Sequence, residues 1–309
     1  MAHRPLLQVF SGLQRHAAHP PPPLVRLLDL KHDPAMAQTI RPELAALLAP
    51  ISKFKARSFE TSLTSHIPLL QSCTPQAAAS PSVVLLGDSM LERFITTGES
   101  PNLVSPWPSP TLLPGLPEGL GDESRLANVF NAGVGGDKIQ NMAYRLLGDP
   151  ENKLPSLAAC IEQLKSVKVW VVHAGTNNLT PKRGLSDQDA DALEMLLMAV
   201  LKIEGAPGLR ARPKLIVTGI GYRKDVSDEM VDAANSKLER VVGKLNDLEE
   251  GKGRLSFFPA AQGLNKDEHL VDHVHLTLEG YRIWVRELFP EVLRTLKEME
   301  DLEATTEGK

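Results

Sequence analysis

Cysteine is scarce in this sequence of 309 residues, which holds only Cys73 and Cys160. Two cysteines cannot form a disulfide framework, so a reducing compartment is the default expectation. An excess of basic residues is also lacking, because 34 Lys and Arg stand against 38 Asp and Glu, for a net charge of −4. Proteins that bind nucleic acid neutralise phosphates with clustered Lys and Arg, so this balance argues against a nucleic-acid partner.

Long apolar runs are missing as well. No stretch approaches the ~20 apolar residues that cross a bilayer, so we expect no stable membrane insertion. The composition is otherwise ordinary for a globular protein, with 42% hydrophobic and 23% charged residues, and it supplies enough apolar side chains for a core. The length suits one large domain or two small ones.

The first 30 residues are basic and contain no acid before Asp29. Four consecutive prolines, residues 20–23, exclude a helix at that point because proline lacks the backbone donor. The apolar run of residues 6–10 is too short for a secretory signal. We therefore expect a disordered tail on a cytoplasmic protein, with a mitochondrial presequence as the alternative.

Residues 41–72 have the pattern of a partly helical segment. Three leucines from Leu44 onward fall on one helix face, and Pro42 suits a first helical turn. The stretch 76–82 is rich in Ala and Ser, as linkers are. These patterns predict an N-terminal extension over residues 1–80, partly disordered and partly helical, a main domain over residues 81–300 and a tail over residues 301–309.

An alternation of strands and helices begins at Ser82. Short apolar runs typical of buried parallel strands are residues 83–87, 127–131, 167–173, 214–219 and 255–259. Between and after them, apolar residues recur at helical spacing over 193–201, 230–245 and 281–288, and Pro290 should kink or restart the last helix. This order predicts an α/β fold, a three-layer flavodoxin-like sandwich with a five-stranded parallel sheet.

Polar residues gather where these strands end, which is where α/β sheets bind ligands. Ser89 follows the first strand, and Asp272 and His275 follow the last. A serine hydroxyl becomes a strong nucleophile when an imidazole takes its proton and a carboxylate orients that imidazole. Asp272 and His275 are three residues apart, so one turn can present both side chains.

Donors for a developing oxyanion are also present. Small residues let backbone N–H groups approach, which makes the Ser89 N–H and the Gly135-Gly136 pair candidates. The side chain of Asn177, after the third strand, can add another N–H. These residue types together predict acyl transfer through a serine nucleophile.

At this point the chain resembles a known family, the SGNH (GDSL) hydrolases. The blocks that carry the resemblance are Gly87-Asp88-Ser89, Asn131-x-Gly133, Gly175-x-Asn177 and Asp272-x-x-His275, in that order. Longer runs are similar to the catalytic subunits of the intracellular platelet-activating-factor acetylhydrolases, namely 86–90, 131–137, 175–178 and 275–281. The resemblance covers about residues 82–296 and makes the main domain an SGNH hydrolase catalytic domain.

The resemblance implies a role for each matching residue. Ser89 is the nucleophile, His275 the base and Asp272 the partner that orients it. The oxyanion donors are the N–H groups of Ser89 and Gly136 and the side chain of Asn177. Four residues flank these positions and are expected to bind substrate: Met90, Leu91, Thr176 and Val274.

The function implied is a serine esterase that hydrolyses carboxylic esters with short, acetyl-type acyl groups, without a cofactor. The substrate would be a small-molecule or lipid-like ester, and the resemblance also allows a homodimer. A lysophospholipase or an O-acyltransferase at the same site stays open, as does a non-catalytic interaction module that kept the fold.

Three histidines near this site have other readings. His269 and His273, with Asp272 and His275, could form a metal cluster, but ligands from a second segment are not evident, so we expect no metal and place both histidines at the surface or beside the site. His173 ends the third strand and is expected to be a hydrogen-bonded core histidine, with a place near the acyl pocket as the alternative.

The segment 97–121 is the longest irregular connection in the predicted domain. It holds six prolines and several large apolar residues, among them Trp107. Long loops at the rim of a site are commonly functional. We expect it to pack over or beside the Ser89 pocket, as a rim or lid, and to set which ester enters, with packing on the N-terminal extension as the alternative.

Overall fold

The computed structural model describes residues 40–73, 80–96, 103–127, 129–204 and 212–307. All of them fall within one compact unit, residues 37–309. The tail expected over the first 30 residues, and the choice between a disordered tail and a presequence, lie outside the described residues.

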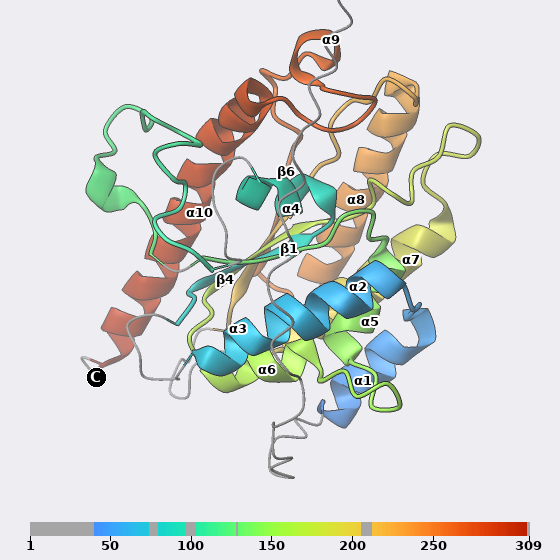
Figure 1. The fold of residues 1–309 in the computed structure, drawn as a ribbon. Helices are drawn as coiled ribbons and strands as arrows, with labels where there is room; N and C mark the ends of the chain where they lie inside the picture. Colours follow the sequence, from blue (N-terminus) through green and yellow to red (C-terminus); the bar gives the residue numbers. More distant parts are fainter. Residues whose placement is uncertain (1–39, 74–79, 97–102, 128, 205–211, 308–309) are drawn as a thin grey trace, which may run out of the picture. The chain divides into compact units, whose positions relative to one another are not determined.

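A six-stranded sheet in the order β2-β3-β1-β4-β5-β6 forms the centre of the fold (Figure 1). Five strands are parallel: β1 (Val83–Gly87), β3 (Val129–Gly133), β4 (Val169–His173), β5 (Lys214–Thr218) and β6 (Leu255–Phe258). The predicted five-stranded parallel sheet is therefore confirmed. The sixth strand, β2 (Leu103–Val104), was not expected; it comes from the proline-rich segment and pairs antiparallel with β3.

Helices and short turns connect the strands. The helices are α1 (Pro42–Leu48), α2 (Ala56–Thr61), α3 (Ile67–Ser72), α4 (Ser89–Thr96), α5 (Ile139–Leu147), α6 (Leu157–Leu164), α7 (Asp187–Lys202), α8 (Asp228–Asn246), α9 (Lys266–His269) and α10 (Leu278–Glu307). A π-helical turn, Ser62–His66, joins α2 to α3. α10 continues through Pro290 as one helix, so the restart expected there does not occur.

The two faces of the sheet bury different sets of helices, because successive strand side chains point to opposite sides. Val84 and Leu86 of β1 belong to one apolar cluster with residues of α1, α3 and α5 to α8. Val83 and Leu85 belong to a second cluster with α4 and α10. Figure 1 shows α3 and α6 on one side of β1 and β4 and α10 on the other, which makes the three layers of the predicted sandwich.

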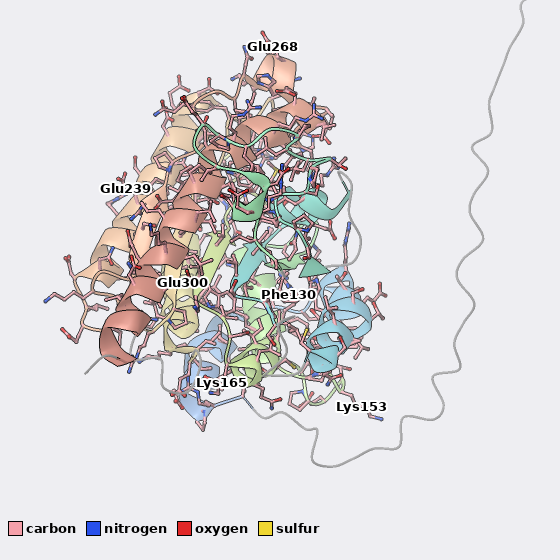
Figure 2. All side chains as sticks on the ribbon, turned by 90° about the vertical axis from the view of Figure 1, so that its left-hand side faces the viewer. Phe130, Lys153, Lys165, Glu239, Glu268 and Glu300 are labelled. Atoms are coloured by element: carbon pink, nitrogen blue, oxygen red, sulfur yellow. The ribbon has the colours of Figure 1, made fainter. Side chains whose placement is uncertain are left out.

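Polar side chains define where the long helices begin. The Ser186 hydroxyl accepts the N–H of Asp189 before α7, and Asp189 accepts the N–H of Ser186 in return. Ser227 caps α8 by accepting the N–H of Met230. Phe130 of β3 is fully buried, whereas Glu239 of α8 and Glu300 of α10 are exposed; Figure 2 labels all three.

The N-terminal helices share the core of the sheet. Leu44 and Leu48 of α1, and Ile67 and Leu70 of α3, are almost completely buried in the first cluster. The described part of the predicted extension is thus packed onto the main domain. The boundary between residues 80 and 81 stays a prediction.

The proline-rich segment packs against α4 and α10. The Trp107 ring is buried and lies edge-on to Phe94 and Phe289, at centroid distances of 6.3 and 5.6 Å. Arg125 fastens the loop by donating to the carbonyls of Pro108 and Leu113. Residues 103–121 therefore pack on the face of the sheet that α4 and α10 cover. They do not pack on the N-terminal extension, which was the alternative expectation. Over the described ranges, no helix has the length and apolar content that a membrane span needs.

The packing of α1 generates a stability prediction. Leu48→Ala should lower the free energy of unfolding by about 2–5 kcal/mol, because it removes a fully buried side chain and leaves a cavity. Leu63→Ala, at a leucine that is 38% exposed in the same N-terminal segment, is the matched control and should cost about 1 kcal/mol or less. Urea denaturation measures both. A loss of about 1 kcal/mol or less for Leu48→Ala would mean that α1 adds little to the core.

Candidate active site

Ser89 stands at the sharp turn between β1 and α4. The turn needs a glycine before it, since a Cβ on Gly87 would lie 2.8 Å from the carbonyl oxygen of His173. Asp88 is buried, and its carboxylate accepts the N–H of Met90 at 2.9 Å. Ser89 begins α4 and is 8% exposed. Its backbone N–H is therefore one of the first, unpaired donors of a helix.

The Ser89 hydroxyl, the His275 ring and the Asp272 carboxylate form one hydrogen-bonded chain. His275 Nε2 lies 2.9 Å from Ser89 Oγ, and Nδ1 lies 2.7 Å from Asp272 Oδ2. An ionised carboxylate only accepts hydrogen bonds, so Nδ1 carries the proton of the neutral ring. Nε2 is then free to accept the Ser89 proton. The structure thus brings together the three residues expected to be nucleophile, base and orienting partner.

The carboxylate of Asp272 is held ionised. Burial raises the pKa of Asp272, but hydrogen bonds from the N–H groups of His275 and Val274 and from the His275 ring outweigh it and hold the pKa well below its usual range. Both N–H groups donate to Oδ1 at 2.8 Å. This leaves Oδ2 for the imidazole, so one short turn fixes the carboxylate and the ring together.

The other two histidines of this region stay apart from the reaction centre. His273 is exposed, and its carbonyl oxygen accepts the N–H of Lys224. His269 ends α9, and its Nδ1 accepts the N–H of Asn265 at 2.9 Å. In the described part of the chain, no group of three or more His, Cys, Asp or Glu side chains could hold a metal ion.

The loop after β3 carries the expected oxyanion donors. A Cβ on Gly133 would lie 2.3 Å from the N–H nitrogen of Glu92, so this loop approaches α4 closely. Gly136 has a positive φ of 75°, a conformation that glycine adopts without strain. Asn177 Nδ2 donates to the Asp137 carbonyl at 2.9 Å and lies 3.4 Å from Asp88 Oδ2. Asn177 thus contacts the neighbours of both Gly136 and Ser89.

A fully buried ion pair holds this loop against the sheet. Arg145 of α5 donates to Asp137 Oδ2 at 2.8 Å, and neither side chain is exposed. Arg145 also donates to the carbonyls of Ala132 and Gly87, at 2.9 and 3.3 Å. The guanidinium therefore links the end of β1, the end of β3 and residues 134–137, the loop with the expected oxyanion donor Gly136, called the oxyanion loop below.

A chain of buried polar groups ends at Asp88, the residue before the nucleophile. His173 Nδ1 lies 2.8 Å from Thr218 Oγ1, and Nε2 lies 2.9 Å from Thr176 Oγ1. Burial lowers the pKa of His173 to about 4, so the ring is neutral. Burial also raises the pKa of Asp88 to about 7, against the hydrogen bonds from Met90 and Thr176. His173 is a hydrogen-bonded core histidine, as expected.

A pocket of about 340 Å³ lies beside these groups. Three of the four residues expected to bind substrate line it, namely Met90, Thr176 and Val274. His173 lines it too; the alternative that His173 lies near the acyl pocket stays a prediction. Leu91 does not reach the pocket: it is fully buried, and its carbonyl accepts the Asn131 side chain.

The proline-rich segment does not cover this pocket. The lining residues include none of the described residues 103–121. The Trp107 ring contacts Phe94, whose ring lies 5.2 Å from that of the lining residue Trp284. Their apolar side chains pack into the core between the sheet and α10, in the same cluster as the pocket residue Met90. That this segment influences which ester enters stays a prediction.

Sequence reasoning missed the residues that support the oxyanion loop. Arg145, Ser58 and Lys55 all contact Asp137, at 2.8, 2.5 and 3.5 Å. The sequence could have pointed to Arg145, because it is a lone arginine on an apolar helix that follows a glycine-rich loop. A buried arginine needs a partner of opposite charge. Nothing in the sequence pointed to Lys55 and Ser58, since they lie about 80 residues before the loop that they contact.

A family model for the GDSL-like lipase/acylhydrolase family matches residues 85–283. The match covers more than half of the chain, so the chain belongs to this family and is a carboxylic ester hydrolase. The resemblance to the SGNH (GDSL) hydrolases is thereby confirmed. The comparison with curated protein sequences yields no match.

Solved structures with a similar chain trace include three proteins named as esterases. A carbohydrate acetylesterase family member from Sinorhizobium meliloti is 18% identical, over 70% of this chain and 99% of that chain, with a TM-score of 0.45. A carbohydrate esterase family 3 protein from Talaromyces cellulolyticus is 19% identical, over 71% and 99%, with a TM-score of 0.46. The aryl esterase of M. smegmatis is 16% identical, over 71% and 100%, with a TM-score of 0.42.

The neutral His173 generates a prediction for stability against pH. Its folded pKa of about 4 lies below the ordinary 6.5, so the unfolded chain binds the proton first as the pH falls. The stability that His173 contributes is complete above pH 6.5 and should fall by about 3 kcal/mol on reaching pH 4. His173→Gln should remove this share of the pH dependence. Parallel curves of unfolding free energy for both proteins would contradict it.

Proposed function

We propose that the protein is a serine esterase that hydrolyses carboxylic esters through an acyl-enzyme on Ser89, with His275 as base and Asp272 as its orienting partner. The observation that carries the proposal is the hydrogen-bonded chain from Ser89 Oγ through His275 to Asp272. It supplies a nucleophile that is already within reach of its base.

Acylation begins when Ser89 Oγ attacks the ester carbonyl carbon and His275 Nε2 takes the hydroxyl proton. The imidazolium is stabilised by Asp272, which already accepts the Nδ1 proton. When the tetrahedral intermediate collapses, the bond to the alcohol oxygen breaks and His275 returns its proton to that oxygen. Water then attacks the acyl-enzyme by the same route and releases the acid and Ser89.

The tetrahedral intermediate carries a negative oxygen that needs donors. In this proposal the N–H groups of Ser89 and Gly136 and the Nδ2 of Asn177 supply them. The helix α4 adds to this effect because the positive end of its dipole lies at Ser89. Asn177 is held beside this position by Asp137.

The size of the pocket favours a second class of substrates, namely esters whose acyl group is longer than acetyl. Its volume of about 340 Å³ lies in the range of about 300–1,000 Å³ in which pockets take whole small-molecule ligands. Met90, Val274 and Trp284 give it apolar walls, and Thr176 and His173 give it polar groups. A short-acyl esterase and a longer-chain acylhydrolase differ here only in how far the acyl chain extends into the pocket.

The homodimer and the cytoplasmic location stay predictions.

The nucleophile is tested by substitution and labelling. Ser89→Ala should abolish burst-phase acylation and most hydrolysis of p-nitrophenyl acetate while the unfolding curve stays unchanged, because the Oγ is the atom that forms the acyl bond. A fluorophosphonate should label the wild-type protein at Ser89, read by mass spectrometry of the peptides. Labelling at another residue, or full turnover in the variant, would refute the proposal.

The acyl pocket is tested by narrowing it. Gly221 lines the pocket, and a Cβ added there meets no atom within 4 Å. Gly221→Phe should lower kcat/KM for hexanoyl and octanoyl p-nitrophenyl esters by about tenfold or more and leave the acetyl ester nearly unchanged. Gly115→Phe is the matched control, since Gly115 is equally open but lies in the proline-rich segment. An unaltered acyl-chain profile would place the acyl group elsewhere.

A further inference from the structure

Lys55 reaches the oxyanion loop from outside the part of the chain that the family model matches. It precedes α2, whereas the match begins at residue 85. Its Nζ donates to the Gly135 carbonyl oxygen at 2.8 Å and lies 3.5 Å from Asp137 Oδ1. The N-terminal segment therefore places a positive charge against the loop that carries Gly136.

The backbone around Lys55 is anchored next to that loop. The Lys53 N–H donates to the Gln140 carbonyl at 3.0 Å, and Asn141 Nδ2 donates to the Lys53 carbonyl at 2.9 Å. The Phe54 ring lies edge-on to Tyr144, at a centroid distance of 5.5 Å. These contacts to α5 fix the position from which the Lys55 side chain extends.

The Gly135 carbonyl and the Gly136 N–H belong to one peptide unit. A trans peptide is planar, so its C=O and N–H point in opposite directions. Two consecutive glycines offer little steric resistance to rotation of the unit between them. A donor that holds the Gly135 oxygen on one side therefore also holds the Gly136 N–H on the other.

Both ends of the loop have hydrogen bonds that do not involve Lys55. Val134 N–H donates to the Gly87 carbonyl at 3.1 Å, and the Asp137 side chain is held by Ser58 and Arg145. The peptide between the two glycines lies between these ties. The ammonium is close to it, since a Cβ on Gly136 would lie 2.8 Å from Lys55 Nζ.

We propose that Lys55 is a positioning residue for the oxyanion hole: its ammonium holds the Gly135 carbonyl and so directs the Gly136 N–H toward the developing oxyanion. The inference rests on the proposed function of Ser89. It assigns part of the catalytic apparatus to the N-terminal segment, whose helices also complete the core.

The first experiment removes the charge and keeps the bulk. Losing a whole oxyanion donor costs about 10²–10³ in kcat, so a donor that is present but no longer held should cost less, and Lys55→Met should lower kcat by about tenfold. The KM should change by no more than about twofold, because the effect is confined to the transition state. Lys53→Met is the matched control: it removes the same charge from an exposed side chain two residues away and should leave kcat unchanged.

A chemical rescue separates positioning from structure. Lys55→Cys treated with 2-bromoethylamine gains a side chain of nearly the original length that ends in an ammonium, and kcat should return. Treatment with iodoethane adds a neutral side chain and should leave kcat low. Wild-type protein treated in the same way controls for alkylation of Cys73, which is partly exposed.

The outcomes distinguish this inference from the proposal on which it rests. Suppose that the wild-type protein hydrolyses esters and reacts with the fluorophosphonate at Ser89. If Lys55→Met then keeps the wild-type kcat or changes only KM, the proposed role of Lys55 is overturned and the proposed esterase function stands. Equal recovery with the neutral and the charged reagent overturns it as well. If the wild-type protein neither labels at Ser89 nor hydrolyses any ester, both proposals fall together.

Discussion

The buried pair of Arg145 and Asp137 is the contact on which the geometry of the site depends. Removing two charges from water is costly, and such a pair is stable only when its remaining donors and acceptors are satisfied. Arg145 meets this condition through the carbonyls of Gly87 and Ala132, and Asp137 through Ser58 and Lys55. The strand that leads to the nucleophile and the loop that leads to the oxyanion donors therefore share one anchor.

The N-terminal segment is part of this arrangement. Its apolar residues fill one face of the sheet, and its polar residues complete the environment of Asp137. The region matched by the family model, residues 85–283, supplies Ser89, His275 and Asp272, while the support of the oxyanion loop comes from earlier in the chain. Core packing and the arrangement of the proposed catalytic groups are thus coupled through α1 to α3.

Much of the fold was predictable because its signals are local. Buried parallel strands read as short apolar runs, and the helices between them have regular apolar spacing. The grouping of Ser89, Asn177 and His275 followed from the same logic, since the carboxyl ends of parallel strands meet at one edge. The packing surface of the proline-rich segment was not predictable, because its apolar residues show that they need burial but not which surface buries them. Leu91 was misplaced because a position beside Ser89 in the sequence can still face the core.

The sequence by itself determined the order of strands and helices, the residue types at the strand ends and the chemistry those types can perform. It did so because propensity, periodicity and short turns depend on neighbours within a few residues. Only the tertiary structure decided that Lys55 and Ser58 meet the loop at Gly135 to Asp137, that His173 is buried and neutral, and that Trp107 packs on α10. Each of these depends on groups that are distant in the chain and are brought together by burial of the two faces of the sheet.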